Sequence, residues 1–202
     1  MSGLSYRTNQ KLSPMMEQWY KCKEKAKDAL LLFRLGDFYE SFYEDAYVIS
    51  KELEVTLTQR QKLPMCGVPW HTCEAYVDKL LNKGFKVAIA EQMEDPKSVK
   101  GIVKREVVRI LTPGTVISSS TLSDKSNNFF VSLSQVGKIF GISIIDLSTS
   151  EFRVMELDSP KALFDELLRI KPKELLLSNK YQKNNSQLLE DLSYHFQFIT
   201  NV

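Results

Sequence analysis

The residues whose types and spacing suggest a binding chemistry are an aromatic ring and a carboxylate two positions apart, Phe38 and Glu40. Residues 30–33 before them form a short apolar run that predicts a buried strand, and apolar residues recur at helical spacing over residues 42–53. Phe38 and Glu40 therefore lie before the helix, in extended chain, where successive side chains alternate between two sides. We expect them to point the same way, about 6.6 Å apart along the strand, with Tyr39 on the opposite side.

The start of the helix is predicted by Ser41 and Glu44. A serine followed three residues later by glutamate is typical of a capping box, in which each side chain binds a backbone amide near the first turn. The pair places the first helical residue at about Phe42. Residues 34–42 alone leave two interpretations open. One is an aromatic wedge displayed beside a carboxylate, and the other is a strand-end aromatic packed into the core beside a solvated glutamate.

Residues 34–42 resemble the mismatch-reading segment of the MutS family, the bacterial DNA mismatch-recognition proteins, whose Phe-x-Glu motif would be Phe38, Tyr39 and Glu40. Other stretches resemble the same family in the same order. Residues 13–20 resemble its opening helix, residues 63–71 its proline-rich loop, and residues 90–96 and 104–115 the segment that closes its first domain. A single Phe-x-Glu is weak evidence, whereas this ordered set covers nearly all of residues 13–115.

The resemblance implies that the chain recognises mispaired or unpaired bases in double-stranded DNA for mismatch repair. Phe38 would insert into the minor groove and stack on the mispaired base, and Glu40 would form a hydrogen bond with an edge of that base. Unstacking a base step costs a few kcal/mol and costs least at a defect. The protein would therefore distinguish a defective duplex from an intact one by the lower free energy needed to deform it. A carboxylate beside phosphates is electrostatically unfavourable, and an intact duplex provides no hydrogen bond to compensate for it. This penalty adds to the discrimination between mismatched and intact DNA.

The resemblance also places the proline-rich loop beside the mismatch, and four basic residues between positions 97 and 105 form the densest basic cluster of the chain. The further candidate DNA contacts are Leu35, Arg60, Met65, His71, Lys97, Lys100, Lys104 and Arg105. For Met65, a place in the hydrophobic core is an open alternative. The alternating lysines of residues 21–27 do not share one helical face, which favours a solvated surface over a phosphate-binding stripe.

The composition is that of an ordinary soluble protein and does not by itself indicate a nucleic-acid-binding protein. Of the 202 residues 43% are apolar, and no apolar run reaches the length of about 18 residues that predicts a membrane span. The polar N-terminus has no apolar signal region, which predicts a cytoplasmic protein. The net charge is only +2, so any contact with DNA must come from a local basic patch and must weaken with salt.

The pattern of predicted elements divides the chain at a linker. Residues 1–115 alternate helices with strands, and residues 63–71 form a loop that contains prolines. Residues 116–128 are rich in Ser, Thr, Asn and Asp, which is typical of a linker. The first part is predicted to be a mixed-sheet α/β (mixed α+β) domain, and the resemblance makes it the mismatch-recognition domain. The helices are expected at residues 14–26, 42–53 and 73–82, and the strands at residues 30–33, 55–58, 85–90 and 104–111.

Residues 129–202 are predicted to form a second domain. Strands at residues 129–133, 139–146 and 151–157, joined by short turns, indicate a meander, which a helix at residues 160–170 and a strand at residues 174–177 follow. This order suggests an incomplete ribonuclease-H-like sheet and resembles the MutS connector domain. The chain ends on a helix near residues 188–196 and a strand-like piece at residues 197–199, which suggests an N-terminal fragment of a longer protein.

The sequence predicts no catalytic residue, metal site or cofactor. Gly137 and Lys138 do not belong to a phosphate-binding loop, so the chain is expected not to be an enzyme and neither to bind nor to hydrolyse ATP. His71 lies near Cys66 and Cys73 in the sequence, but no third group is evident to orient a base. The odd number of cysteines, without paired spacing, predicts reduced thiols.

The resemblance implies further properties for a longer parent protein. These are a DNA-dependent ATPase that uses ATP and Mg²⁺, a homodimer, and contact with the partner protein MutL through the connector domain.

Two other functions are open alternatives. A metal-dependent, structure-specific nuclease would use Asp146, at the end of a strand of the ribonuclease-H-like sheet, or the acidic cluster of Glu91, Glu94 and Asp95. Two-metal cleavage needs carboxylates that converge on both ions, and these residues fall in different predicted domains. The other alternative is that the second domain serves only as a protein-interaction module.

Overall fold

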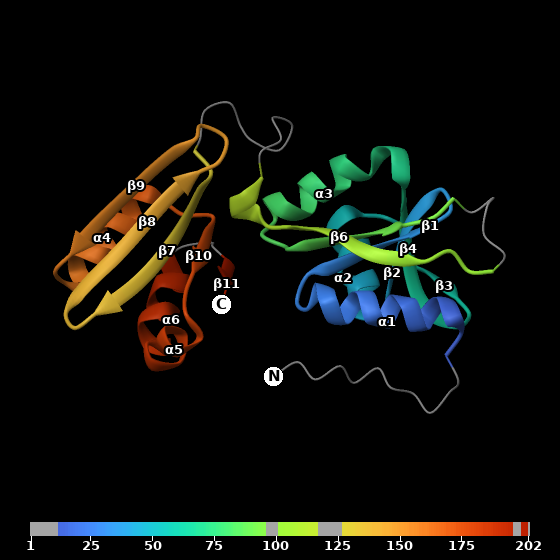
Figure 1. Cartoon of the computed structure of the whole chain (residues 1–202), viewed down its shortest axis with the longest axis horizontal. Helices are drawn as coiled ribbons and strands as arrows, with labels where there is room; N and C mark the ends of the chain where they lie inside the picture. Colours follow the sequence, from blue (N-terminus) through green and yellow to red (C-terminus); the bar gives the residue numbers. More distant parts are fainter. Residues whose placement is uncertain (1–11, 96–100, 117–126, 196–198, 202) are drawn as a thin grey trace.

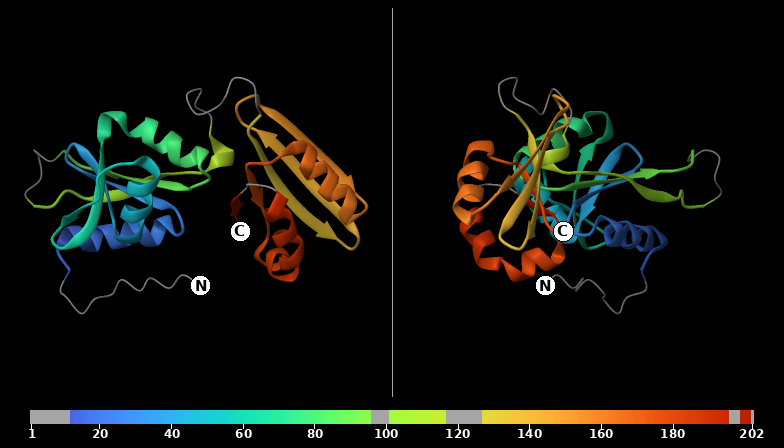
Figure 2. Two further views of the ribbon diagram at one scale, coloured as in Figure 1. Left: turned by 180° about the vertical axis from the view of Figure 1, so that it is seen from behind. Right: turned by 60° about the vertical axis from the view of Figure 1, so that its left-hand side comes forward.

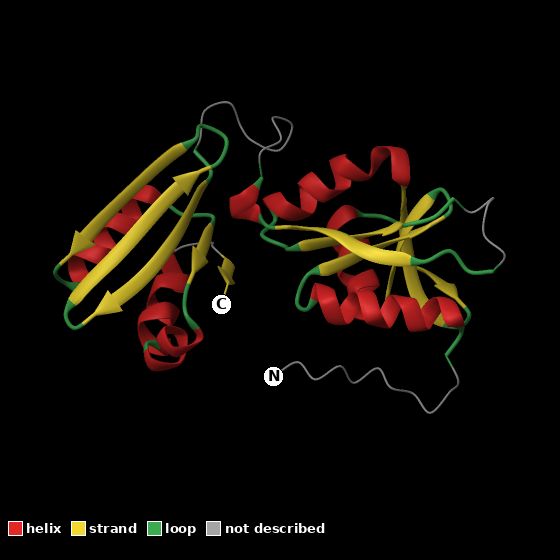
Figure 3. Ribbon diagram, viewed as in Figure 1, coloured by secondary structure: helices red, strands yellow, loops and turns green. Residues whose placement is uncertain are grey.

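The computed structural model describes residues 12–95, 101–116, 127–195 and 199–201, and the chain forms two units around two separate sheets (Figure 1). In the first unit the strands lie between helices, whereas in the second unit the helices pack in one buried cluster against the sheet (Figure 3). Both sheets contain parallel and antiparallel neighbours, which confirms the predicted mixed α/β fold class. No helix among the described residues is long and apolar enough to cross a membrane.

The first unit is a six-stranded sheet in the order β3-β4-β2-β1-β5-β6. β1 runs parallel to β5, and the other neighbouring strands pair antiparallel. The strands are β1 (Leu30–Leu35), β2 (Phe38–Phe42), β3 (Thr58–Arg60), β4 (Leu63–Pro69), β5 (Val87–Gln92) and β6 (Arg105–Leu111).

Helices cover both faces of this sheet (Figure 2). On one face, α1 packs through Trp19 in a buried cluster with Phe33 and Phe42. On the other face, α2 and α3 pack through Ile49 and Val77 in a second cluster. The helices are α1 (Pro14–Ala26), α2 (Tyr43–Leu53) and α3 (Cys73–Asn82), and the short 3₁₀ helix η1 (Trp70–Thr72) precedes α3. The predicted bounds of α1 are confirmed, with Ser13 Oγ accepting a hydrogen bond from the Met16 amide at 3.4 Å.

The second unit is a five-stranded sheet in the order β11-β10-β7-β8-β9. β7, β8 and β9 form the predicted antiparallel meander, and β10 and β11 extend it in parallel, which is the strand arrangement of a ribonuclease-H-like sheet. Helix α4 covers the face turned away from the viewer in Figure 1 and toward the viewer in the left view of Figure 2. The elements are β7 (Phe129–Val136), β8 (Ile139–Asp146), β9 (Glu151–Leu157), α4 (Pro160–Ile170), β10 (Glu174–Leu176), α5 (Asn179–Asn184), α6 (Ser186–His195) and β11 (Ile199–Asn201).

The predicted capping box at Ser41 and Glu44 is wrong. Helix α2 begins at Tyr43, and the residue before it, Phe42, makes no side-chain cap hydrogen bond. Ser41 is part of β2 and fully buried, and its hydroxyl donates to the carbonyl of Leu31 at 2.6 Å. The serine is therefore engaged in a contact between neighbouring strands, which the local sequence does not reveal.

The prediction for residues 55–71 is also wrong in part. The strand predicted at residues 55–58 begins only at Thr58, and the proline-containing stretch is strand β4 rather than a loop. A two-residue turn joins β3 to β4, with Gln61 and Lys62 both at positive φ, 52° and 67°, as such hairpin turns require. Pro64 pairs only with β3, and Pro69 pairs only with β2. Each proline therefore has no strand partner on its other side, where the lack of an N–H donor costs no hydrogen bond of the sheet. The short helix α5 is a further element that the sequence pattern did not predict.

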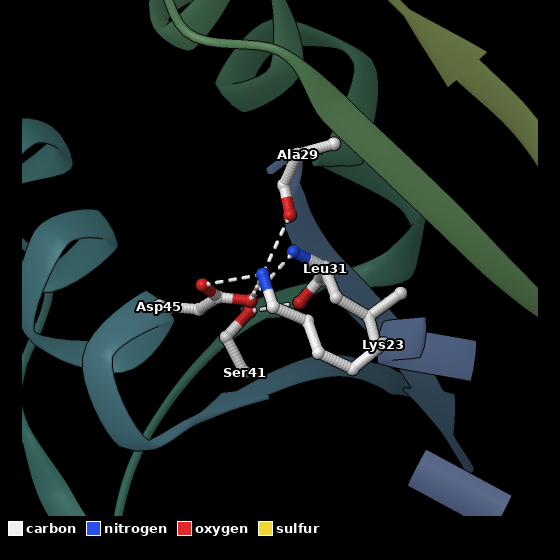
Figure 4. A network of polar contacts seen from close by, with 5 residues as sticks. All are labelled: Lys23, Ala29, Leu31, Ser41 and Asp45. Atoms are coloured by element: carbon white, nitrogen blue, oxygen red, sulfur yellow. Dashed lines mark hydrogen bonds and ion pairs between the residues drawn. The ribbon is translucent and has the colours of Figure 1, made fainter. Parts of the chain in front are cut away.

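A buried ion pair joins α1 to α2 and to the start of β1 (Figure 4). Lys23 Nζ lies 2.8 Å from both carboxylate oxygens of Asp45 and 2.7 Å from the carbonyl oxygen of Ala29. The same carboxylate accepts a hydrogen bond from the Leu31 amide at 3.0 Å. Burial raises the pKa of the Asp45 carboxyl above its ordinary value, against the opposing effect of Lys23. The charge of Asp45 is therefore tolerated in this position because Lys23 compensates it.

The short 3₁₀ helix η2 (Pro113–Thr115), which follows β6, attaches the first unit to the second. The amide of Gly114 donates to the buried carboxylate of Glu174 at 3.1 Å, and Asn128 Nδ2 donates to the carbonyl of Pro113 at 2.8 Å. Val116 packs in the core of the first unit. A Cβ on Gly114 would lie 2.7 Å from Cβ of Glu174 and 3.0 Å from Cδ2 of Phe130, so a glycine is needed where the two units meet.

Replacing Lys23 with methionine should lower the free energy of unfolding by about 3–5 kcal/mol, because the carboxylate of Asp45 is then buried without its counter-charge. The double variant Lys23→Met/Asp45→Leu should recover most of this loss, since neither charge remains. Urea unfolding of both variants measures the two values. Equal losses in the single and the double variant would show that packing around Lys23, not the ion pair, carries the effect.

Gly114→Ala should cost about 1–3 kcal/mol, the usual range for forcing a methyl group into filled space. Gly67→Ala is the matched control, because a Cβ there meets its neighbours at 3.5–3.8 Å, an ordinary contact distance. Thermal unfolding of both variants tests this. If the Gly114→Ala protein is as stable as the Gly67→Ala protein, the contact between the two units accommodates a methyl group at no cost in unfolding free energy.

Candidate nucleic-acid interface

The hairpin of β1 and β2 presents Phe38 at its end. Leu35 pairs with Phe38, so Gly36 and Asp37 form a two-residue turn, and Gly36 has a φ of 59°. Phe38 is the first residue of β2 and keeps 47% of its surface exposed. A large apolar side chain on a short, paired hairpin is held in place by backbone hydrogen bonds on both of its neighbouring strands.

Glu40 lies on the same face of the sheet as Phe38, as the strand alternation predicts. Gly67 of β4 pairs with Glu40, and a Cβ on Gly67 would lie 3.6 Å from Cγ of Glu40 and 3.8 Å from Cδ1 of Phe38. Because glycine has no side chain, a space stays open between the ring and the carboxylate. Tyr39 points to the other face, where it is buried and its hydroxyl donates to Glu91. Burial, together with the carboxylate of Glu91, raises the pKa of the Tyr39 hydroxyl.

The carboxylate of Glu40 is buried and only half satisfied. Its Oε1 atom forms an ion pair with Arg60 of β3, whose side chain is 44% exposed. Its Oε2 atom is buried and has no hydrogen-bond partner among the described residues. Such an oxygen is unfavourable unless a donor reaches it, so the site is suited to accept a hydrogen bond from outside the chain.

Two other candidate contacts, Leu35 and Met65, share this face. Leu35 lies directly opposite Phe38 and is half-buried. Met65 pairs with Phe42 and packs against the buried cluster under α1, which supports the core alternative for this methionine. The structure therefore brings Leu35, Arg60 and Met65 to the sheet face of Phe38 and Glu40.

His71 is placed differently. It is exposed on η1, after the end of β4, with its ring 6.2 Å from that of Trp70. The Trp70 amide donates to the carbonyl of Asp37 at 3.0 Å, and the guanidinium of Arg34 lies 4.7 Å from the Trp70 ring centre. η1 is thereby fixed to the turn before Phe38. The sequence analysis missed the contact of Arg34 with Trp70, because no local pattern relates two residues so far apart in the chain.

Of the four residues of the predicted basic cluster, Lys97 and Lys100 lie outside the described residues. The other two, Lys104 and Arg105, have different surroundings. Lys104 is exposed and pairs with Glu106 at 2.8 Å. Arg105 is half-buried, and its guanidinium donates to the carbonyl of Arg34 at 2.6 Å and to that of Val103 at 2.7 Å. Burial lowers the pKa of Arg105, whereas nearby Glu40 acts in the opposite direction, so the two side chains are within electrostatic range.

The three cysteines are buried free thiols, as predicted. Burial raises the pKa of Cys66 and of Cys73 to about 12, so both stay protonated at neutral pH. Since the thiolate is the nucleophile, these residues have no reactive form to offer to His71.

Comparison with known proteins identifies two family domains along the chain. The family profile described as MutS domain I matches residues 13–120, and the profile described as MutS domain II matches residues 128–202. The chain is 56% identical over 192 residues to the DNA mismatch repair protein MutS of Protochlamydia amoebophila, which covers 95% of this chain and 22% of that protein. It is 48% identical to proteins of the same name from Chlamydia abortus, over 94% of this chain and 23% of the relative, and Caldanaerobacter subterraneus, over 88% and 21%. The chain thus spans less than a quarter of the length of these relatives.

The acidic residues considered for a nuclease have structural partners. Asp146 is fully buried at the end of β8 and accepts hydrogen bonds from the amide of Asn128 at 3.1 Å and from the amide and hydroxyl of Ser148 at 2.9 and 2.6 Å. Glu91 binds Tyr39, and Glu94 accepts from the amide of Lys104. The described residues contain no group of three or more His, Cys, Asp or Glu side chains able to hold a metal ion. These positions give the nuclease alternative no support.

Asp146 should make the stability of the chain depend on pH. Burial alone would raise its pKa, but hydrogen bonds from Ser148, Asn127 and Asn128 outweigh burial and lower the pKa below its ordinary value. A lowered folded pKa means that the ionised group stabilises the fold above the unfolded pKa of about 3.9, and that this contribution is lost as the pH falls through the folded pKa. Asp146→Asn should therefore lose about 1–3 kcal/mol at pH 7 and less near pH 3, as measured by urea unfolding. A loss that stays constant between the two pH values would exclude the ionised form as its cause.

Proposed function

The chain belongs to the MutS family of DNA mismatch repair proteins, and from this premise we propose that it recognises mispaired or unpaired bases in double-stranded DNA. Phe38 is the wedge that enters the minor groove and stacks on the defective base. Glu40 forms a hydrogen bond with an edge of that base. The observation that carries this proposal is the exposed ring of Phe38 beside the half-satisfied carboxylate of Glu40, with Gly67 leaving the space between them open.

The position of Phe38 suits insertion into a base step. An aromatic ring that is nearly half exposed gains apolar contact when it enters the stack, and a paired hairpin loses little conformational entropy on doing so. Inserting a side chain costs a few kcal/mol of unstacking, and a mismatched step, which stacks poorly, lowers that cost. A wedge of fixed position therefore selects defects by their deformability.

The carboxylate adds a second test of the base. An unpartnered buried oxygen such as Oε2 of Glu40 is relieved when a donor of a base reaches it. A mispaired base has an edge free for this contact, whereas a paired base uses its edge within the duplex. Intact DNA therefore gains no such hydrogen bond from the buried carboxylate, which favours the mismatch.

Arg60 makes this carboxylate compatible with DNA. Its ion pair with Oε1 of Glu40 offsets the negative charge that the phosphates would otherwise meet, and leaves Oε2 available. Arg60 is also partly exposed, so it can contact solvent or phosphate from the same position. Its role is therefore to compensate the charge of Glu40 rather than to read a base.

The remaining properties concern a longer protein, because the chain spans about a fifth of the length of its relatives. ATP and Mg²⁺ as ligands of an ATPase, the homodimer, and the contact with MutL through the second unit are proposals for that longer protein. The 202 residues themselves are proposed to bind DNA without catalysing a reaction.

Fluorescence anisotropy with a G·T mismatch duplex and its matched partner, at low salt, tests the proposed function. The unchanged chain should prefer the mismatch, and Phe38→Ala should reduce this preference by roughly 5- to 150-fold, the equivalent of about 1–3 kcal/mol of lost stacking. Phe152→Ala is the matched control, because Phe152 is 65% exposed on β9 of the other sheet. It should leave both affinities unchanged.

Glu40→Gln completes the experiment, since it removes the charge and keeps the shape. Binding of the matched duplex should tighten, because the repulsion from phosphates is gone, and the preference for the mismatch should fall. A Phe38→Ala chain that keeps its mismatch preference would disprove the wedge, and a Glu40→Gln chain with unchanged discrimination would disprove the role of the charge.

A further inference from the structure

A groove of about 550 Å³ lies between α1 and the start of β6, beside the hairpin that carries Phe38. Lys21 and Lys25 line it from α1, and Lys104 and Arg105 line it from the opposite side. Lys21 and Lys25 are four residues apart and so project from the same side of the helix. Their side chains and that of Lys104 are exposed, so a ligand can reach them.

The charge balance of the groove is positive. Its lining contains these four cationic side chains and two carboxylates, those of Glu24 and Glu106. Lys104 pairs with Glu106, whereas Lys21 and Lys25 have no ion-pair partner among the described residues. Lys25 and Lys104 both lower the pKa of Glu106, which shows that the charges from the two walls act on each other. The lining of this concave site therefore carries two more positive than negative charges, and an anion bound there interacts with both walls.

Arg105 holds the groove in a fixed relation to the wedge. Its guanidinium donates to the carbonyl of Arg34, on the strand that leads to Phe38, and lies 5.4 Å from the ring centre of Phe33. On the α1 side, the amide of Arg105 donates to Oε1 of Gln18 at 3.0 Å. Arg105 is thus a positioning residue, because its hydrogen bonds join the wall formed by α1, the wall formed by β6 and the hairpin.

The register of the sheet gives the spacing between groove and wedge. Phe38 pairs with Leu35 on β1, Phe33 pairs with Ala90 on β5, and Gln92 pairs with Arg105 on β6. Arg105 is therefore three strand spacings from Phe38, roughly 14 Å, on the same end of the sheet. The minor groove of B-DNA is about 6 Å wide, so a site at this distance from an inserted ring lies over the sugar–phosphate backbone rather than over the bases.

We propose that this groove binds the phosphate backbone of duplex DNA on one flank of the base step that Phe38 contacts, with Lys21 and Lys25 as the phosphate ligands. The proposal rests on the proposed function, and it adds a contact that carries affinity without sequence or mismatch information. It assigns to α1 a part in DNA binding beyond its packing against the sheet.

The test is duplex binding by Lys21→Gln/Lys25→Gln over a series of salt concentrations. Affinity for the matched and the mismatched duplex should fall several-fold by the same factor, and the slope of log K against log salt should become shallower by about 1 to 2. Glu24→Gln should act in the opposite sense and tighten both complexes. Glutamine keeps helix propensity close to that of lysine and glutamate, and thermal unfolding verifies that α1 is intact.

Lys161→Gln/Lys180→Gln is the matched control, with the same change in net charge at exposed positions of α4 and α5. A slope that stays unchanged in the α1 variant, an effect no larger than that of the control, or absence of duplex binding by the unchanged chain would overturn the groove as a DNA site. The ratio of mismatch to match affinity reports on Phe38, whereas the salt slope reports on the groove. Loss of either property alone therefore identifies which of the two proposals has failed.

Discussion

The buried ion pair of Lys23 and Asp45 is the constraint on which the hairpin of β1 and β2 depends. Removing two charges from water is costly, and the cost is offset only when every donor and acceptor is used. The ammonium group uses its three N–H donors on the two oxygens of Asp45 and on the carbonyl of Ala29, and the carboxylate also accepts the Leu31 amide. This arrangement requires one relative position of α1, α2 and the start of β1. Because β1 continues directly into the turn before Phe38, contacts inside the core set the position of this side chain.

The hairpin end follows the opposite principle, since its polar groups are left incompletely satisfied. Glu40 is as buried as Asp45, yet one of its oxygens has no partner among the described residues, and its ion pair with Arg60 is open to solvent on one side. Gly67 could carry a methyl group at ordinary contact distance, so the space beside Glu40 is not forced by backbone strain. The two buried carboxylates thus differ in how completely their oxygens are satisfied, and only the one beside the exposed ring of Phe38 is left with an unpartnered oxygen among the described residues. Local inconsistencies of this kind are expected where function outweighs stability.

Sequence patterns predicted those features that depend on neighbours along the chain. The helices expected at residues 14–26 and 160–170 are α1 and α4, with the predicted bounds, and the alternation in β2 predicted the common face of Phe38 and Glu40. The same reasoning failed at Ser41 and in β4, because the hydroxyl of Ser41 and the prolines of β4 are accommodated by neighbouring strands that no local pattern identifies. It also took the lysines of α1 together as a solvated surface. Lys23 proved to be buried, and Lys21 and Lys25 line a groove together with residues of β6, which lies some eighty residues further along the chain.

β6 links the hairpin of the first unit to the segment that contacts the second unit. Its first residue, Arg105, organises the groove and contacts the hairpin, and its last residue, Leu111, leads directly into the segment that binds Glu174 of the second unit. β6 is paired with β5 along its whole length, apart from one irregularity beside Ile89. Beyond the other end of β6, Gly114 has no free space toward Glu174 and Phe130. One paired strand therefore joins the hydrogen bonds that Arg105 makes with the hairpin to the close packing between the two units.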